Sequence, residues 1–285
     1  MSWSNYHSHC TFCDGRSTME DFIKFALAKN VRKYGFSSHA PLPFNTFWNM
    51  KLDDLDDYKN EFYRLKNKYS SQIDLYLGLE ADYIHDFIDI KNQLYNLDDF
   101  DYLIASVHYM DRLPNGNFWT VDGNFTDFEG GLRTLFDGDI KLAVLRYFQI
   151  TMAMIQKGGF DMVGHLDKIA MNGSKCKEFD KTASWYKQIV GETLEQIKKH
   201  NLILEINTKS VNTLGITFPD VQFYSLVHEL KIPIVVNSDC HYPSSITEGF
   251  QLVYKNLQQT GFKTLSQLIK GNWTDFEFDE NGIKF

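Results

Sequence analysis

Histidines and carboxylates recur along the chain at spacings that suit metal binding. The segment NYHSHCTFCDGRS begins with His7 and His9, two residues apart. In an extended strand, side chains at this spacing project to the same side, so both imidazoles can reach one ion. Asp239 and His241 repeat the spacing near the other end of the chain. Imidazole and carboxylate ligands favour a hydrolytic site for zinc, manganese or iron.

Two cysteines lie beside these first histidines. Cys10 and Cys13 form a C-x-x-C pair, which could be a redox dithiol or half of a zinc knuckle. The other two cysteines, Cys176 and Cys240, form no second pair at zinc-knuckle spacing, and no thioredoxin-like context surrounds the motif. We therefore assign the metal chemistry to the histidines and to Asp14, and we interpret the cysteines as small packing residues.

The elements that would position these residues are short apolar runs, each followed by a helical pattern. The runs LILEIN and IPIVVNSD are nearly continuous, as parallel strands covered on both faces should be. Seven strands alternating with helices predict an α/β fold with a closed or nearly closed barrel, and a doubly wound open sheet is the alternative. The predicted strands are 3–9, 34–39, 73–82, 101–109, 160–165, 202–207 and 232–239.

No linker or internal repeat divides the chain. We therefore expect a single barrel domain over residues 1–285, with a long loop around 111–131 and a short C-terminal hairpin around 276–285. The predicted helices lie at 17–30, 55–69, 86–96, 139–157, 180–199, 219–230 and 263–270.

Most of the histidines fall at equivalent places in this pattern. The C-terminal ends of barrel strands meet on one face, where active sites form. Glu80 and Asp239 also lie at strand ends, so the set exceeds the needs of one ion and predicts a cluster of two or three metals bridged by Glu80. His85, His200 and His228 lie elsewhere and are not expected to bind metal. The histidines at or just past strand ends are His7, His9, His39, His108, His165 and His241.

The composition limits the possible partners. Hydrophobic residues make up 43% and charged residues 23% of the chain, which is typical of a globular protein. A formal net charge of −8 argues against a nucleic-acid-binding surface. The N-terminus lacks a signal-peptide pattern and no long apolar stretch occurs, so we expect a cytoplasmic protein with no membrane partner.

Six ordered motifs resemble those of the PHP (polymerase and histidinol phosphatase) superfamily. They are YHSHCTFCDG, FSSHAP, GLEADY, ASVHY, VGHLDKI and NSDCHYP, and they run from residue 6 to residue 243. The resemblance implies a distorted (β/α)7 TIM-like barrel with a trinuclear metal centre at the C-terminal strand ends. By motif, it implies one ion held by His7, His9, Glu80 and Asp239, a second by Glu80, His108 and His165, and a third by Asp14, His39 and His241.

The motifs are most similar to those of the histidinol-phosphatase branch. This resemblance implies hydrolysis of L-histidinol phosphate, in histidine biosynthesis, by attack of a metal-bridging hydroxide. Asp239 or His241 would pass a proton to the leaving oxygen.

Three further features could bind the substrate. Arg16 is the best candidate for a phosphate fork, and Lys209 could also reach the mouth of the barrel. Phe44 and Trp48, in the PFNTFW segment after His39, could wall a pocket for an imidazole ring.

Other activities remain open at this point. Members of the same superfamily could act as nucleases or protein-tyrosine phosphatases, although a nuclease needs a basic groove. Amidohydrolase barrels also begin with H-x-H, but they usually carry a lysine at the fourth strand, where this chain has Ser106, Val107 and His108. A non-catalytic metal-storage role is the remaining alternative.

Overall fold

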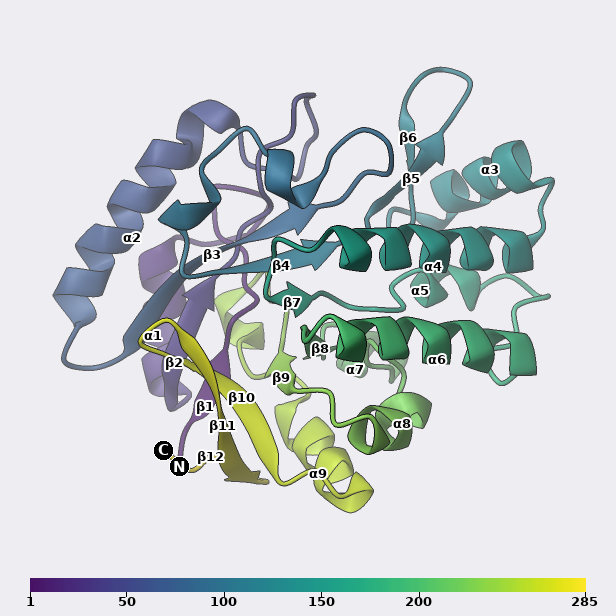
Figure 1. Ribbon diagram of the computed structural model, residues 1–285. Coiled ribbons are helices and arrows are strands. Elements are labelled where there is room, and N and C mark those ends of the chain that lie inside the picture. Colours follow the sequence, from purple (N-terminus) through teal and green to yellow (C-terminus); the bar gives the residue numbers. More distant parts are fainter.

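The centre of the computed structural model is a barrel of parallel strands surrounded by helices (Figure 1). The structure describes residues 1–285, apart from the side chain of Asn92. Within the described residues, seven strands form the main sheet, and their order in the sheet follows their order in the chain. They are β1 (Trp3–Asn5), β2 (Val31–Phe36), β3 (Asp74–Asp82), β4 (Tyr102–Ser106), β7 (Met162–Val163), β8 (Ile203–Asn207) and β9 (Ile234–Asn237).

The two outer strands of this sheet, β1 and β9, come together and nearly close the barrel. Just beyond them, Ser8 and Cys240 form a parallel bridge, and the His9 N–H donates to the Cys240 carbonyl over 3.0 Å. The Tyr6 N–H donates to the Asn237 side chain over 2.8 Å. The expected TIM-like barrel is confirmed. The doubly wound alternative is wrong, because such a sheet reverses its strand order at a switch point and leaves two free edges.

Helices cover the outside of the barrel (Figure 1). The first of them begins after Thr18, whose hydroxyl accepts the Asp21 N–H over 3.2 Å, as expected of an N-cap. Among the described residues, no helix combines the length and the apolar character needed to cross a membrane. The α-helices are α1 (Met19–Ala28), α2 (Leu55–Tyr69), α3 (Phe125–Phe136), α4 (Ile140–Lys157), α5 (Ala170–Gly173), α6 (Ser184–Lys199), α7 (Val211–Leu214), α8 (Tyr224–Glu229) and α9 (Phe250–Thr260).

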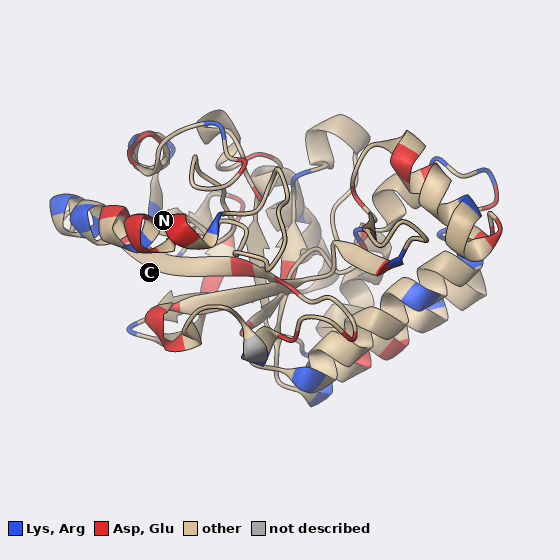
Figure 2. Cartoon of the chain, turned by 90° about the horizontal axis from the view of Figure 1, so that it is seen from above, with Lys and Arg blue, Asp and Glu red and all other residues tan. Residues whose placement is uncertain are grey.

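Charged residues on these helices are of mixed sign. Figure 2 shows Lys and Arg interspersed with Asp and Glu along the outer helices. On α2, for example, the Arg64 guanidinium donates two hydrogen bonds of 2.7 Å to Glu61. Some of the acidic residues on the outer surface are therefore neutralised locally by ion pairs.

Aromatic side chains fill the end of the barrel at which the strands begin. Tyr102 is buried, and its hydroxyl donates to the Tyr6 carbonyl over 2.5 Å. A Cβ added at Gly78, on the neighbouring strand, would lie 2.5 Å from the Tyr102 ring, so only glycine leaves room for it. The Tyr76 hydroxyl donates to the Leu268 carbonyl, which ties this end of the barrel to the C-terminal sheet.

The C-terminal sheet consists of β10 (Thr264–Ile269), β11 (Asn272–Asp279) and β12 (Gly282–Ile283). The helix predicted over 263–270 is wrong. Lys270 and Gly271 have φ angles of 49° and 80°, the left-handed pair that a tight β-hairpin requires, and the β10–β11 ladder follows from it. The pair β11–β12 lies where we predicted a hairpin, and Ile283 also pairs with Ser2, so the chain ends are neighbours (Figure 1).

Two connecting segments differ from the prediction. In place of a helix over 86–96, the chain forms short 3-10 turns at Ile90–Asn92 and Leu97–Asp99. The Asp89 side chain accepts the Lys91 N–H over 3.1 Å, a local bond that competes with helix formation. The predicted loop over 111–131 instead contains a hairpin, β5 (Tyr109–Arg112) with β6 (Phe118–Thr120), followed by the start of α3.

Candidate metal centre

The C-terminal ends of the barrel strands carry a dense group of histidines and carboxylates. Most of these side chains are buried, and Asp14 and His241 are half-buried at the edge of the group. The structure brings together all nine residues that the sequence suggested as ligands, although they are spread from the first strand to the loop after the last. They are His7, His9, Asp14, His39, Glu80, His108, His165, Asp239 and His241.

Glu80, at the end of β3, lies at the middle of this group. Its Oε2 atom is 3.2 Å from His7 Nε2 and 3.0 Å from His39 Nδ1. Its Oε1 atom is 2.8 Å from His165 Nε2 and 3.4 Å from His108 Nε2. Each carboxylate oxygen therefore faces a different pair of imidazoles, which is the geometry that a bridging ligand needs.

The donor atoms form three overlapping groups, each compact enough for one ion. They are His7, His9 and Asp239; His39, Glu80 and His108; and His9, Asp14, His39 and His241.

This grouping differs from the ligand sets implied by the sequence motifs: Glu80 is absent from the first group and His165 from the second. His9 belongs to two groups, and His39 lies with Glu80 as well as with Asp14. His165 lies beside the second group, with its Nε2 atom 3.2 Å from His108 Nε2.

Several polar atoms in the group are buried without a hydrogen-bond partner among the described residues. They include Nε2 of His7 and His9, Nδ1 of His39, and Oδ1 of Asp14. A buried polar atom without a partner is costly, and in folded proteins nearly all such atoms are satisfied. Lone pairs that converge in this way fit divalent cations, since imidazole and carboxylate are the donors that zinc, manganese and iron accept.

Carboxylates behind the group fix the orientation of two imidazoles. His7 Nδ1 lies 2.6 Å from Glu205 Oε1, and His108 Nδ1 lies 2.7 Å from Asp82 Oδ1. Because ionised carboxylates only accept, each Nδ1 carries the proton and each Nε2 faces the centre. Burial alone would lower the pKa values of His7 and His108. Nearby carboxylates outweigh it, raising the pKa of His7 well above its ordinary range and that of His108 to about 10.

His9 has a weaker partner. Its Nδ1 atom lies 3.5 Å from the Cys13 sulfur, so Cys13 contacts a candidate ligand and is more than a packing residue. Burial raises the pKa of Cys10 to about 11 and that of Cys13 to about 12. Both groups are therefore neutral thiols near neutral pH, which excludes them as thiolate nucleophiles or ligands in this state.

The loop after β1 brings Asp14 back to the centre. Asp14 Oδ1 lies 3.2 Å from His241 Nε2, and the Arg16 N–H donates to the His241 carbonyl over 2.8 Å. A Cβ added at Gly15 would lie 2.3 Å from the His9 backbone, so this tight return needs glycine. The Arg16 side chain is exposed at the edge of the site.

Asp239 and Lys209 lie beside His241 at the same end of the barrel. Lys209 Nζ lies 3.0 Å from Asp239 Oδ1 and 3.3 Å from His241 Nδ1. Burial favours the neutral lysine, but the Asp239 carboxylate outweighs it and raises the pKa of Lys209. Burial likewise opposes ionisation of Asp239, yet Lys209 and His7 hold the pKa of that carboxyl well below its usual range.

The aromatic segment after His39 lies beside the second group. The Trp48 ring stacks on Tyr109 with centroids 5.5 Å apart, and Phe44 meets the same ring at 5.8 Å. Asn49 connects this cluster to the centre, because its amide donates to Asp82 Oδ2 over 3.2 Å and its oxygen accepts from the Tyr109 hydroxyl. Phe44 and Trp48 are thus placed near the site, but they mainly pack against other aromatics.

Four charged residues of the site were not among those that the sequence pattern predicts. Asp82 stands two residues after Glu80 on the same strand, so the alternation of β-strand side chains would have revealed it. Glu205 lies within the LEIN strand, where the apolar pattern hid it. Asp122 and Lys168 follow β6 and β7 in irregular loops that carry no periodic signal. Lys168 is buried, and Asp122 Oδ2 lies 3.9 Å from His108 Nε2.

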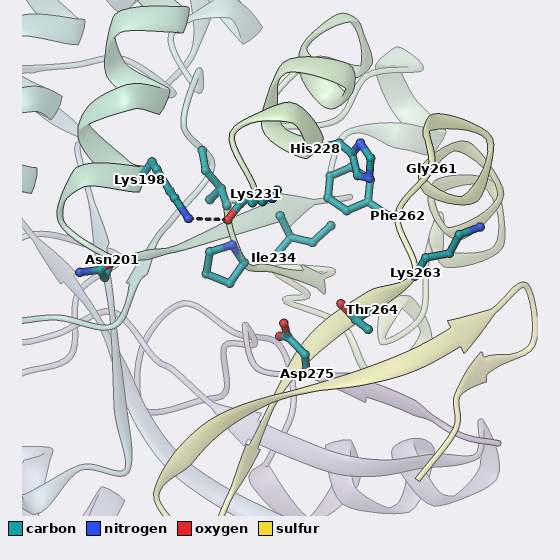
Figure 3. A pocket seen from close by; sticks show the side chains of 12 residues that line it. Lys198, Asn201, His228, Lys231, Ile234, Gly261, Phe262, Lys263, Thr264 and Asp275 are labelled. Atoms are coloured by element: carbon teal, nitrogen blue, oxygen red, sulfur yellow. Dashed lines mark hydrogen bonds between the residues drawn. The ribbon is translucent and has the colours of Figure 1, made fainter.

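The remaining histidines lie away from the strand ends. His85 Nδ1 lies 3.3 Å from the Tyr83 hydroxyl, and His200 forms the C-cap of α6. His228 packs against Phe262 at the edge of a cavity of about 490 Å³ (Figure 3). That cavity opens where β9 begins, at the opposite end of the barrel from the histidine group, so we exclude it from the candidate centre.

The comparison with known protein families agrees with this geometry. Residues 5–209 match the model of the family described as PHP domain. The chain belongs to the PHP domain family. A histidinol-phosphatase of Bacillus subtilis is 26% identical over 263 residues, which cover 86% of this chain and 96% of that protein. A histidinol-phosphatase of Lactococcus lactis is 27% identical over 212 residues, covering 73% of this chain and 72% of that protein.

Solved PHP structures share the barrel. A crystal structure from Listeria monocytogenes gives a TM-score of 0.78 at 24% identity and covers 87% of this chain and 99% of its own. A second, of histidinol phosphate phosphatase from Lactococcus lactis complexed with zinc, L-histidinol and phosphate, gives 0.72 at 21% identity. It covers 100% of this chain and 99% of its own. These likenesses support the fold assignment.

Proposed function

We propose that this PHP protein is a metal-dependent phosphomonoesterase that hydrolyses L-histidinol phosphate to L-histidinol and phosphate. The observation that carries the proposal is the convergence of buried imidazole and carboxylate donors, with unpartnered atoms, at the C-terminal end of the barrel. The histidinol-phosphatases among its relatives, which match most of the chain, supply the substrate. The whole chain, residues 1–285, would act as one barrel domain.

The proposed cofactors are two or three zinc, manganese or iron ions. His7, His9, Glu80 and Asp239 would hold the first, Glu80, His108 and His165 the second, and Asp14, His39 and His241 the third. When bound, such ions supply Lewis-acid charge to phosphoryl oxygens and lower the pKa of water towards neutrality. The carboxylates Glu205 and Asp82 would keep His7 and His108 in the tautomer that binds a cation.

The chain's own residues would hold the substrate and manage the leaving proton. Lys209 Nζ contacts the His241 ring, and the Arg16 N–H donates to the His241 carbonyl; these two residues are the proposed phosphate contacts. Asp239 and His241 are the proposed proton-transfer residues. Of the two, His241 has the more accessible side chain, 15% exposed against 3%, so it exchanges protons with solvent more readily. Phe44 and Trp48 would form an aromatic wall for the imidazole ring.

The free cysteines support a proposed location in the cytoplasm. All four are free thiols among the described residues, and such thiols persist in a reducing compartment. The proposed partner is a small phosphate ester, and the net charge of −8 argues against a nucleic acid.

The decisive experiment measures phosphate release from L-histidinol phosphate in parallel with an aryl phosphate, a phosphotyrosine peptide and single-stranded DNA. The protein is assayed as purified, after chelation, and after metal return. We expect a catalytic efficiency for histidinol phosphate orders of magnitude above the others, lost on chelation and restored by metal. Metal-dependent release without this preference would overturn the substrate and keep the phosphomonoesterase.

Variants of the bridging residue test the metal assignment. Glu80→Ala should abolish turnover and lower the bound metal per protein, measured by mass spectrometry. Glu61→Ala, a change on the outer face of α2, is the control and should leave both unchanged. A Glu80→Ala protein with full activity and full metal content would refute the bridging role.

A further inference from the structure

A buried lysine lies at the mouth of the site and is not explained by metal binding. The Lys168 side chain is 4% exposed, and its Nζ atom lies 3.8 Å from Asp239 Oδ2 and 3.9 Å from Asp122 Oδ2. Both contacts are longer than a hydrogen bond. A buried ammonium is costly unless it is paired and hydrogen-bonded, so these contacts leave Lys168 with donor capacity for another anion.

The backbone around Lys168 fixes the direction of this side chain. The Lys168 N–H donates to the His165 carbonyl over 2.9 Å, and the Lys168 carbonyl accepts the Met171 N–H over 3.0 Å. The preceding residue, Asp167, faces elsewhere, since its carboxylate accepts from the Tyr186 hydroxyl over 3.2 Å. The Lys168 ammonium lies 5.4 Å from the centroid of the Phe218 ring, which supports it from one side. The backbone bonds and the Phe218 ring thus direct the ammonium group towards Asp239 and Asp122.

A second ammonium approaches the same carboxylate. Lys209 Nζ contacts Asp239 Oδ1, whereas Lys168 Nζ faces Oδ2. The two lysines come from the loops after β8 and β7, so neighbouring strands deliver them to one carboxylate. In a protein of net charge −8, they are cations of the chain itself beside the candidate ligands.

We propose that Lys168 and Lys209 form a two-lysine clamp for the non-bridging oxygens of the substrate's phosphoryl group. Asp239 and Asp122 hold the ammonium groups at the mouth, and the phosphoryl group completes their hydrogen bonds. Lysine suits this task as a point charge with three donors. The inference rests on the proposed phosphomonoesterase function, but not on histidinol as the alcohol.

The experiment compares Lys168→Met and Lys168→Arg with the wild type. Binding of inorganic phosphate to the metal-loaded protein is measured by calorimetry, and its inhibition constant is measured with an aryl phosphate as substrate. A lost hydrogen bond to a charged group weakens binding about tenfold or more. Lys168→Met should therefore raise the dissociation constant and the inhibition constant of phosphate by that factor, at unchanged metal content. Lys168→Arg should recover part of the loss, and Lys209→Met should act in the same direction.

The matched control is Lys33→Met. Lys33 is also buried and paired, with its Nζ 2.6 Å from Asp74, but it lies where β2 begins, at the opposite end of the barrel. Its loss should lower stability and leave phosphate binding unchanged. If Lys168→Met fails to fold, Lys168→Gln keeps a polar head and gives the same comparison.

The outcomes separate the clamp from the proposed function. Unchanged phosphate binding in a fully metallated Lys168→Met protein would overturn the clamp. The clamp would also be overturned if Lys168→Met lost metal in proportion to its loss of phosphate binding, because the missing metal would then explain that loss. A wild type that hydrolyses no phosphate ester, yet binds phosphate through Lys168, would overturn the phosphomonoesterase and keep the anion site.

Discussion

At the scale of single residues, the carboxylates behind the histidines control how the imidazoles are oriented and which nitrogen carries the proton. Asp82 accepts from His108 through one oxygen and from Asn49 through the other. It therefore connects a candidate ligand to the aromatic segment that follows His39. A change at Asp82 alters the basicity and the orientation of the imidazole without removing any donor from the centre.

Asp82→Asn should weaken metal binding about 10- to 100-fold, because such partners of ligating histidines contribute this much to affinity. The measurement is competition with a chromophoric chelator. Asp86→Asn, four residues on and 89% exposed, is the matched control and should bind metal like the wild type. Equal affinity in the Asp82 and Asp86 variants would contradict the role assigned to Asp82.

The protonation of His108 gives a prediction about pH. Burial opposes the charged form, but Glu80 and Asp82 raise its pKa in the metal-free protein to about 10. A metal ion must displace this proton, so affinity should increase as pH rises from neutrality towards 10. The stability that the charged imidazole gives the metal-free fold is complete below about pH 6.5, its ordinary pKa, and is lost as pH rises through 10.

Calorimetry in buffers of different ionisation enthalpy counts the protons released on metal binding. The wild type should release about one proton more than His108→Gln at pH 7.5, since one ionisable imidazole separates them. Proton release that is identical in the two proteins would show that His108 is neutral before metal binds.

At the scale of elements, the C-terminal sheet closes the end of the barrel that the active site does not use. Its connection depends on Tyr6, whose hydroxyl accepts the Leu268 N–H over 3.1 Å and contacts Gln267 over 3.3 Å. Both partners are buried, so removal of the hydroxyl leaves a backbone N–H without an acceptor.

Tyr6→Phe should therefore lower the free energy of unfolding by about 1–3 kcal/mol, measured by denaturant titration. Tyr254→Phe provides a close comparison. Tyr254 is equally buried, but its hydroxyl has no partner among the described residues, so its removal should be neutral or stabilising. Equal destabilisation by the two changes would mean that the hydrogen bonds of Tyr6 contribute nothing beyond ring packing.

The same elements show where sequence reasoning succeeds and where it stops. Strands such as β8 and β9 were predicted to within a few residues, because buried parallel strands are continuous apolar runs. For β10 the sequence predicts a helix, but the partner strand β11 and the Lys270–Gly271 turn decide its conformation. In the site, residues at strand ends could be found from the pattern. Lys168 and Asp122 could not, because tertiary packing alone brings these loop residues to the mouth.

At the scale of the whole molecule, the candidate centre joins parts of the chain that are remote in sequence. Buried carboxylates such as Glu80, Glu205 and Asp239 lie within one small region. Without cations, the buried imidazole atoms that have no hydrogen-bond partner among the described residues oppose folding. Bound metal should therefore contribute to global stability as well as to catalysis.

Chelation should lower the midpoint of thermal unfolding. One ion at 100 times its Kd stabilises the folded state by about 2.7 kcal/mol. In a domain of this size, we expect the loss of one such ion to lower Tm by about 5 °C or more. Differential scanning calorimetry with and without a chelator, followed by metal return, measures the effect. A Tm that does not change on complete metal removal would contradict it.

The pairing of Ser2 with Ile283 affects how the chain can fold during translation. β1 precedes His7 and His9 and is made long before β12, which carries the Ile283 that pairs with Ser2. Asp239 and His241 also emerge late. A nascent chain therefore gains its full set of candidate ligands only after Asp239 and His241 have emerged, and the Ser2–Ile283 pair only after β12 has emerged. Joining the neighbouring termini by a short linker and opening the chain at an exposed loop would reverse this order of events and leave the barrel intact.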